Sequence, residues 1–439
     1  MAESKHSHGR RGRSPVLRAW CVLGAGLTIT ALAGCSSNGS SPAASSTPAT
    51  VTLKFWNQYN EVDGEQKAMV DVVIPAFEKA NPGIKVQSIY YNDNVIEQKF
   101  LAAAAAGDPP DVMRADIADV PALANQGTLT DLGTAMPNYK AITASALPGP
   151  LATNEWKGQY YGLPLDTNTQ ALYWNKALFA AAGLSGPPTT LSQLFADAAK
   201  LTNKSKGIYG LGVDGTDIWN VAPYIWSSGG SFTNVDFTTA SGYMDSPATE
   251  AAVQTLVSLR KKGDIGTDFL GGTGAVSGEE GFPKGQYAMY IDGPWAVPTF
   301  TADKNVPSYG IAQFPSGSGG SVSTVGGEDV IIPAGTKHLA DAEKFAAFLD
   351  QPLSQLEMAQ QGDMSVMTTD AAGEVKNDSY DAIFTTQLET ARDRAVVPNY
   401  AELDTDFSDA LQKILAGKVS VDAGLAQAAS AANKALSSS

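Results

Sequence analysis

Cysteine and histidine are scarce in this chain of 439 residues, which contains two cysteines and three histidines. Both cysteines, Cys21 and Cys35, lie near the N-terminus, so the rest of the chain cannot form a disulfide and must rely on a hydrophobic core. His6 and His8 are also near the N-terminus, which leaves only His338 in the main body. These absences argue strongly against a Ser-His-Asp triad, a Cys-His pair or a zinc site with several histidines.

Positive charge is scarce as well, with 30 Lys and Arg against 45 Asp and Glu and a formal net charge of −15. The first 34 residues contain five basic and one acidic residue, so removing their charge of +4 leaves −19 on the remaining chain. Such a charge is repelled by phosphate backbones and by anionic lipid headgroups. We therefore expect no nucleic-acid partner and no direct electrostatic binding to a membrane.

The apolar stretch Ala19–Gly34 has sixteen residues, which is too short to span a bilayer comfortably. A basic segment precedes it and small residues end it, an arrangement typical of a signal peptide. We predict that residues 1–34 are a signal peptide and that the protein is exported; an uncleaved membrane anchor is the alternative. Residues 35–50 are rich in Ser, Ala, Pro and Thr, and they are predicted to form a disordered tether because they cannot bury enough apolar surface to fold.

Beyond residue 50, strand patterns alternate with helix patterns. Val51–Trp56 alternates apolar and polar residues as a strand does, Val95–Ala106 is Ala-rich and helical, and Tyr287–Asp292 has a buried-strand pattern. This order predicts an α/β fold with mainly parallel sheets flanked by helices. About 390 residues are too many for one ordinary domain, so two units of roughly 150 to 200 residues are expected, with a ligand cleft between them.

Asp116, Asp166 and Glu328 each follow or adjoin the end of a predicted strand. Two carboxylates are enough for a glycosidase, but the same side chains can accept hydrogen bonds from the hydroxyl groups of a bound ligand. The sequence has no P-loop, nucleophile-elbow or calcium-loop motif, so binding is favoured over catalysis. An exported glycan-active hydrolase or lyase that uses these carboxylates is the alternative.

Six tryptophans follow residue 50, and several adjoin Gly, Pro or Asn rather than apolar runs. Trp219, Trp226 and Trp295 are expected to lie in loops. An exposed aromatic face suits the C–H face of a sugar ring, while neighbouring carboxylates and amides bind its hydroxyl groups. Packing in the core is the alternative for each tryptophan, but the pattern favours carbohydrate binding.

Several separated motifs give the chain a family resemblance. They are Gly107–Val112 (GDPPDV), Tyr161–Pro164 (YGLP), Tyr173–Phe179 (YWNKALF), Phe282–Met289 (FPKGQYAM), Gly293–Trp295 (GPW) and Val397–Tyr400 (VPNY). Together they make the chain similar to the maltose-binding-like extracellular solute-binding proteins of ABC importers. The resemblance implies a two-lobed periplasmic-binding-protein fold that closes on a sugar, a monomer that associates with ABC permease subunits, and neither enzymatic activity nor a cofactor or metal.

The resemblance also implies ligand-binding residues. Trp295 of the Gly-Pro-Trp motif matches a stacking platform, and Asp166 or Asn168 matches a hydroxyl acceptor where the chain crosses between the lobes. Asp116 and Glu328 hold similar cleft-facing positions. The full expected set is Trp56, Gln58, Asn92, Asp116, Asp166, Asn168, Trp219, Trp226, Trp295, Glu328 and Phe407. Pro110–Asp116 and Gly326–Glu328 resemble oligosaccharide binders for α-glucosides in Gram-positive actinobacteria, which favours an oligosaccharide and in particular an α-glucoside.

Two lobes are expected from the same resemblance. Residues 51–163 with about 330–372 form the predicted N-terminal lobe, and residues 164–329 with about 373–439 form the predicted C-terminal lobe.

Leu32–Cys35 resembles the lipobox of bacterial lipoproteins, in which the cysteine is acylated before cleavage. The resemblance implies lipidation of Cys35 and an anchor on the outer face of the cytoplasmic membrane, with a Gram-positive bacterium as the expected source. One acyl chain attaches a protein only marginally, but a multiply acylated cysteine would hold the protein firmly.

We predict that Cys35→Ala releases the protein from the membrane fraction without changing ligand affinity, because the substitution removes only the acylated thiol. Membrane fractionation of cells that express the variant, with Cys21→Ala as the matched control, measures this. A Cys35→Ala protein that stays in the membrane fraction would support the uncleaved anchor instead.

Overall fold

The computed structural model describes residues 50–59, 64–368 and 380–437, without the side chains of residues 93 and 94. The predicted signal peptide, Cys35 and the predicted tether up to residue 49 lie outside these ranges, as do residues 369–379. Within the described ranges, every helix is too short or too polar to cross a membrane.

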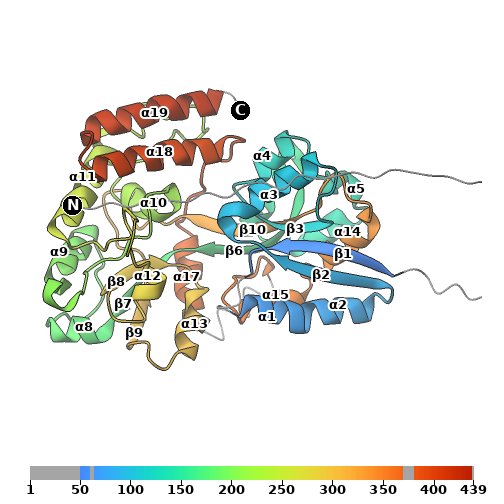
Figure 1. Ribbon diagram of the computed structural model, residues 1–439, viewed down its shortest axis with the longest axis horizontal. Helices are drawn as coiled ribbons and strands as arrows, with labels where there is room; N and C mark the ends of the chain where they lie inside the picture. Colours follow the sequence, from blue (N-terminus) through green and yellow to red (C-terminus); the bar gives the residue numbers. More distant parts are fainter. Residues whose placement is uncertain (1–49, 60–63, 369–379, 438–439) are drawn as a thin grey trace, which may run out of the picture. The chain divides into compact units, whose positions relative to one another are not determined.

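The first sheet has five strands in the order β2-β1-β3-β10-β6 (Figure 1). β1 pairs in parallel with β2 and β3, whereas β10 is antiparallel to both β3 and β6, so β10 alone of these five runs against the others. The mainly parallel sheet that we predicted for the N-terminal lobe is therefore confirmed. The strands are β1 Val51–Asn57, β2 Ile84–Tyr90, β3 Val112–Asp116, β6 Gly162–Thr169 and β10 Val325–Ile331.

Side chains of this sheet alternate between two hydrophobic cores, one on each face. Leu53 and Phe55 belong to the first core and Trp56 to the second, and in β10 Val330 belongs to the first and Ile331 to the second. Successive side chains of a strand point to opposite faces, so this alternation shows that helices cover both faces.

The first core packs against α1 (Glu65–Ala68), the π-helical turn η1 (Met69–Val73), α2 (Ile74–Ala80), α5 (Leu132–Ala135), α6 (Tyr139–Ile142), α14 (Leu339–Leu349) and α15 (Pro352–Ala359). The second core packs against α3 (Asp93–Ala105) and α4 (Val120–Asn125). The same part of the chain contains the 3₁₀ turn η2 (Thr143–Ser145), α7 (Pro148–Thr153) and the strand pair β4 (Glu155–Trp156) and β5 (Gln159–Tyr160).

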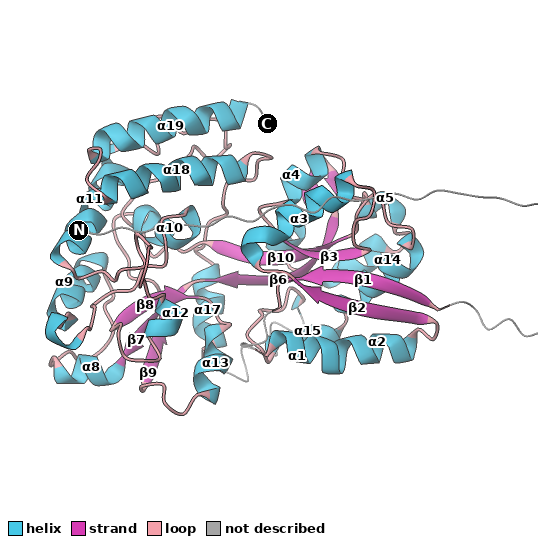
Figure 2. Ribbon diagram, in the orientation of Figure 1, coloured by secondary structure: helices cyan, strands magenta, loops and turns pink. Residues whose placement is uncertain are grey.

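A second sheet has the order β8-β7-β9, with β7 Ala171–Asn175, β8 Met289–Asp292 and β9 Tyr309–Ala312 (Figure 2). The helices of this part are α8 (Lys176–Ala181), α9 (Leu191–Leu201), the 3₁₀ turn η3 (Lys204–Lys206), α10 (Ile218–Ser227), α11 (Pro247–Lys262), α12 (Gly278–Gly281), α13 (Ala296–Ala302), α17 (Asp381–Leu388), α18 (Tyr400–Leu415) and α19 (Val421–Ser437).

The prediction of a mainly parallel sheet is wrong for these three strands, because β7 is antiparallel to both β8 and β9. β7 follows β6 after a single residue, Gln170, so no crossover helix sets its direction, and its partners come from distant parts of the chain. The segment 208–213 makes isolated bridges outside the sheets: Ile208 is antiparallel to Asn203, and Tyr209 and Leu211 are parallel to Tyr287 and Ile265.

The chain passes between the two sheets at β6 and β10. β6 remains in the first sheet up to Thr169, and β10 joins that sheet at Val325, so the predicted boundaries at 163/164 and 329/330 fall inside these two strands. α14 packs against the first sheet, whereas α18 and α19 at the C-terminus pack in the core of the second part (Figure 1). Segments far apart in the sequence thus meet at the ends of β6 and β10.

Phe345 of α14 is fully buried, with its ring edge-on to Phe55 at 5.2 Å and to Phe77 at 5.0 Å between centroids. We predict that Phe345→Ala lowers the free energy of unfolding by about 3 to 5 kcal/mol, because it leaves a cavity among these rings. Urea denaturation measures the change. The control Leu353→Ala, at a side chain that is 47% exposed, should cost less than about 0.5 kcal/mol, and an equal loss in both variants would contradict this account of the core.

Candidate functional site

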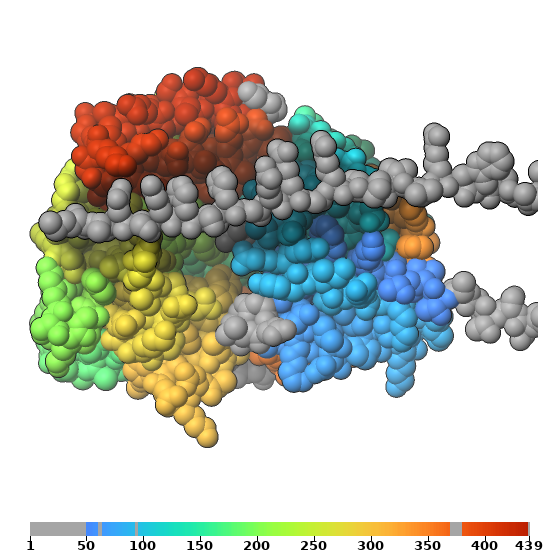
Figure 3. Space-filling model, viewed as in Figure 1, coloured from blue at the N-terminus to red at the C-terminus, as the bar shows by residue number. Residues whose placement is uncertain are grey.

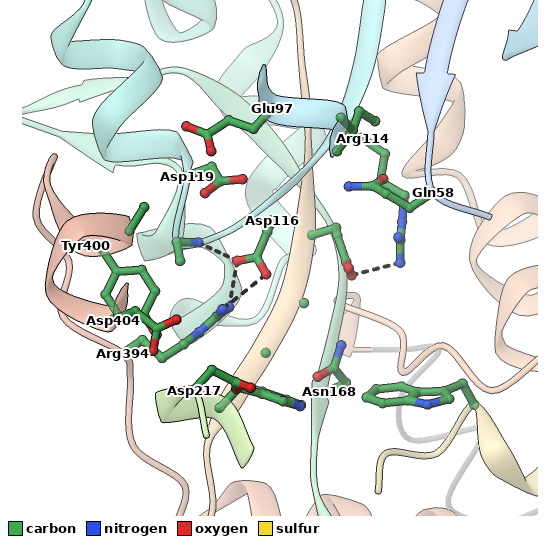
Figure 4. A pocket seen from close by; sticks show the side chains of 18 of the residues that line it. Gln58, Glu97, Arg114, Asp116, Asp119, Asn168, Asp217, Arg394, Tyr400 and Asp404 are labelled. Atoms are coloured by element: carbon green, nitrogen blue, oxygen red, sulfur yellow. Dashed lines mark hydrogen bonds and ion pairs between the residues drawn. The ribbon is translucent and has the colours of Figure 1, made fainter. Parts of the chain in front are cut away.

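A cleft of about 750 Å³ lies where β3, β6 and β10 of the first sheet meet α3, α10 and α18. Figure 3 shows the C-terminal helices α18 and α19 along one edge of the molecule's face, and Figure 4 shows the cleft from close by. The residues that line it are Gln58, Glu65, Ile96, Glu97, Gln98, Arg114, Asp116, Ala118, Asp119, Asn168, Asp217, Trp219, Glu279, Trp295, Gly326, Gly327, Glu328, Arg394, Tyr400, Ala401, Asp404 and Thr405.

Two tryptophans form an aromatic wall of the cleft. The expectation of a loop is wrong for Trp219 and Trp226, which both lie in α10. Trp219 is in the first turn of this helix, where the Asp217 side chain accepts a hydrogen bond from Asn220 N at 3.0 Å. Trp295 lies with its ring against Gly293, since a Cβ at that glycine would be 2.0 Å from Cζ3 of the indole. The two indole rings are tilted by 28° with centroids 6.4 Å apart, and both are half-buried, so each leaves part of its surface to the cleft.

Arg114 is the centre of a buried ionic cluster. Its Nη2 donates a hydrogen bond to Asp166 Oδ2 at 3.2 Å and forms an ion pair with Glu328 Oε2 at 2.8 Å. Its guanidinium carbon lies 4.6 Å from the centroid of the Tyr59 ring, which adds a cation–π contact. The side chains of Arg114 and Asp166 are only 7% and 3% exposed, so water screens their attraction weakly.

The carboxyl groups of this cluster retain protons more readily than carboxyls in water. Burial raises the pKa of Asp166 to about 7, although Arg114 acts to lower it. Burial also raises the pKa of Glu328 well above its ordinary value, and the hydrogen-bonded Asp166 raises it further. Burial and the proximity of the two carboxyls therefore favour their protonated forms, and Arg114 opposes this by favouring their ionised forms.

A second arginine connects the two parts of the chain. Arg394 precedes α18, and it donates to Asp116 at the end of β3 through Nη1–Oδ2 at 3.1 Å and Nη2–Oδ1 at 2.6 Å (Figure 4). Its guanidinium carbon also lies 5.5 Å from the Trp219 ring centroid and 5.7 Å from that of Tyr400. This bidentate pair therefore joins a carboxylate of the first sheet to the aromatic wall of the second part.

Two glycines let β10 pass close to β6 and α10. A Cβ at Gly326 would lie 2.1 Å from Asn168 Oδ1 and 2.8 Å from the Trp219 ring. Gly327 has a φ of +133°, and a Cβ there would lie 2.4 Å from the backbone oxygen of Asp166. No larger residue fits these positions without moving the cleft wall. The Gly-Gly pair therefore determines how closely β10, and with it Glu328, lies to β6.

The family profile described as "Bacterial extracellular solute-binding protein" matches residues 73–384, which lie across both sheets. The chain belongs to this family. It is 29% identical over 431 residues to a protein of Brucella abortus named as a binding protein, with 96% of this chain and 99% of that protein covered. It is 28% identical over 344 residues to the multiple sugar-binding protein of Streptococcus mutans, with 74% and 76% covered.

A solved structure confirms the predicted two-lobed fold of this solute-binding protein. An ABC transporter solute-binding protein of Thermotoga lettingae, crystallised with α-D-tagatose, matches with a TM-score of 0.80 and 25% identity, over 88% of this chain and 100% of the other.

Six of the predicted site residues of the solute-binding protein line the cleft: Gln58, Asp116, Asn168, Trp219, Trp295 and Glu328. Asp166 lies directly behind them, bonded to Arg114. The structure therefore brings together residues from β3, β6, β10 and α10 with the residues that directly follow β1 and precede α13.

Four other predicted site residues do not line the cleft. Trp226 is 5% exposed and lies in the core, edge-on to Phe232. Phe407 is fully buried and packs against the same Phe232 ring, with centroids 4.9 Å apart. Trp56 points to the core beneath α3, 4.6 Å from the Tyr91 ring. Asn92 precedes α3, and its backbone oxygen accepts bonds from the first turn. The three aromatic residues pack in hydrophobic cores, so the alternative interpretation holds for Trp56 and Trp226, and the expected role of Phe407 at the cleft is wrong.

Sequence reasoning missed the two arginines and several acids of the cleft. Arg114 and Asp116 are two residues apart on one strand, so they share a face, a spacing that could have marked Arg114. Arg394 carried no comparable signal, because it is 278 residues from its partner Asp116. The acids that line the cleft and were not predicted are Glu65, Glu97, Asp119, Asp217, Glu279 and Asp404.

The described ranges contain no group of three or more His, Cys, Asp or Glu side chains that could hold a metal ion.

We predict that Arg114→Met lowers the free energy of unfolding by about 3 to 5 kcal/mol at pH 8, because it leaves buried carboxyls without their cation. The pKa of Asp166 rises from 3.8 to about 7 on folding, so the folded state binds the proton more tightly and stability falls as pH rises through this interval. Without Arg114 the pKa of Asp166 should rise further, so the loss of stability between pH 5 and pH 8 should be larger and the variant should regain part of its stability at pH 5.

Urea denaturation of the variant at pH 5 and pH 8 measures both effects. Arg392→Met removes an exposed arginine and serves as the control, with little expected change at either pH. An Arg114→Met protein with the same stability loss at both pH values would contradict the buried carboxyl pair.

Proposed function

We propose that this solute-binding protein captures a sugar in the cleft and delivers it to the permease subunits of an ABC importer. The observation that carries the proposal is the pair of half-buried indoles, Trp219 and Trp295, beside a set of oxygen acceptors. The C–H faces of a sugar ring stack on indole, and its hydroxyl groups donate hydrogen bonds to amide and carboxylate oxygens.

Two buried acceptors of the cleft support this role. Gln58 Oε1 and Asn168 Oδ1 have no hydrogen-bond partner among the described residues, although their residues are only 7% and 9% exposed. Buried polar atoms in folded proteins are nearly always satisfied, so these two are suited to bind the hydroxyl groups of a ligand.

The comparisons agree with a sugar ligand, since one relative is named a multiple sugar-binding protein and one matching structure holds α-D-tagatose. The cleft volume of about 750 Å³ is larger than one sugar ring fills, which supports an oligosaccharide, with an α-glucoside as our specific candidate. Because both parts of the chain contribute contacts, binding should favour a closed arrangement of the lobes.

We infer a receptor rather than a hydrolase from the ion pairs that the carboxylates form with two arginines. A glycosidase needs one carboxylic acid and one carboxylate free to act on opposite sides of a glycosidic bond. Here Asp116 is bound by both terminal nitrogens of Arg394, and Asp166 and Glu328 share Arg114. These contacts fix the carboxylates in place and favour binding over proton transfer.

Export and lipid anchoring complete the proposal. Acylated Cys35 and the tether of residues 35–50 would hold the monomeric receptor at the outer face of the cytoplasmic membrane of a Gram-positive bacterium. The permease would then meet the receptor at a local concentration set by the tether rather than at the bulk concentration.

Calorimetric titration of the full chain with maltose, trehalose and cello-oligosaccharides, followed by product analysis, tests the proposal. We expect saturable binding of at least one sugar without turnover. Hydrolysed or eliminated products would contradict the receptor, and no binding of any sugar would contradict the substrate class.

We predict that Trp295→Ala weakens sugar binding by about 1 to 3 kcal/mol, because it removes one stacking surface. Calorimetry measures the affinity, and thermal unfolding should show that the variant still folds. Tyr243→Ala, at an aromatic residue that is 40% exposed and outside the cleft, should leave the affinity unchanged. Unchanged affinity in a folded Trp295→Ala protein would reject the stacking role.

A further inference from the structure

Negative charge dominates the cleft. Its lining includes eight carboxyl side chains but only two basic ones, Arg114 and Arg394, and neither lysine nor histidine is among the lining residues. The carboxyl groups belong to Glu65, Glu97, Asp116, Asp119, Asp217, Glu279, Glu328 and Asp404. A cleft with this balance attracts cations.

Both arginines are already bound to carboxylates of the first sheet. Arg114 holds Asp166 and Glu328, and Arg394 holds Asp116 through two nitrogens. Their positive charge is therefore compensated inside the protein and is not available to balance further acids.

Three acids from three elements remain without a basic partner. No Lys, Arg or His nitrogen of the described residues lies within 4.0 Å of the carboxylates of Glu97 on α3, Asp217 before α10 or Asp404 on α18. Asp217 and Asp404 accept backbone hydrogen bonds from Asn220 and Ile218, at 3.0 and 2.6 Å, which orient the two carboxylates. We call these three residues, Glu97, Asp217 and Asp404, the acidic end of the cleft.

The acidic end surrounds the Asp116–Arg394 pair. Figure 4 shows Glu97 above Asp116, with Asp404 and Asp217 on the side of Arg394. The charge of Asp116 raises the pKa of Glu97 in addition to burial, and Asp217 likewise adds to the raised pKa of Asp404. Glu97 thus interacts with Asp116, and Asp404 interacts with Asp217 and Asp116, so a positive charge placed beside Asp116 would relieve repulsion on both sides.

Two amides of the same cleft give independent evidence that a ligand binds in it. The unpartnered buried oxygens Gln58 Oε1 and Asn168 Oδ1 line the same cleft and require hydrogen-bond donors. A bare metal ion does not fit, because the described residues hold no group of three ligating side chains arranged for one. An organic cation with several donors matches both sets of acceptors.

We propose that the sugar bound by this protein carries an amine, and that its ammonium group binds at the acidic end while a ring stacks on Trp219 and Trp295. An ammonium group supplies three hydrogen-bond donors and no acceptor, the complement of ionised carboxylates. This inference rests on the proposed sugar-binding function and specifies the chemical class of the sugar.

Calorimetric titration of the full chain with a matched pair of disaccharides tests the proposal. The β-1,4-linked dimer of glucosamine carries ammonium groups, whereas its fully N-acetylated form has the same rings and linkage without charge. We expect the amine to bind at least about tenfold more tightly than the acetylated form and than maltose, and its advantage should shrink as salt is added. Equal or weaker binding of the amine would overturn the proposal and leave sugar binding intact, whereas no binding of any sugar would overturn the function on which it rests.

Two variants test whether the ammonium group binds at the acidic end. The double substitution Glu97→Gln, Asp404→Asn keeps the shape and one acceptor oxygen of each side chain but removes two charges, so the preference for the amine should fall by about tenfold or more. Glu402→Gln removes a charge from the exposed side of the same helix α18 and should leave the preference unchanged. A preference that survives the double substitution in a folded protein would overturn the assignment to the acidic end.

Discussion

Three carboxylates lie in one row across the first sheet, and the arrangement of the cleft depends on how their charges are balanced. The register of β10 sets Glu328 directly opposite Asp116 on β3 and Asp166 on β6. Like charges on directly opposite residues destabilise a sheet. Arg114 balances two of them from within the sheet, and Arg394 balances the third from the segment before α18.

The balancing of the three carboxylates by two arginines affects the arrangement of the chain as well as its stability. A buried ion pair contributes little net stability, because burying its charges costs about as much as their attraction returns, but removing one partner is costly. The row of acids therefore fixes the position of the segment before α18, because Arg394 reaches Asp116 only when that segment lies against the first sheet. The same contact places Arg394 against Trp219 and Tyr400, so the charge balance of the sheet and the aromatic wall of the cleft are built together.

Much of this architecture could be predicted from local patterns. The order of strands and helices, the burial of both faces of the first sheet and the positions of Asp116 and Glu328 at the cleft follow from residues near one another in sequence.

The surroundings of the two tryptophans of α10 could not be predicted from local patterns. Trp219 and Trp226 are seven residues apart, close to two helical turns, and so lie on similar faces about 10 Å apart along the axis. One faces the cleft and the other faces Phe232, because different neighbours cover the two ends of the helix. Arg394 was beyond prediction for the same reason, since its role depends on a partner 278 residues away.

A crystal structure of the full chain with a bound sugar, chosen from the titrations for its tight binding, tests the central claim most directly. The account predicts a sugar ring stacked on Trp295 or Trp219, with hydroxyl groups bonded to Gln58 and Asn168 and with the Asp116–Arg394 pair intact. A sugar bound elsewhere on the molecule, or one held in the cleft without contact to either indole, would contradict it.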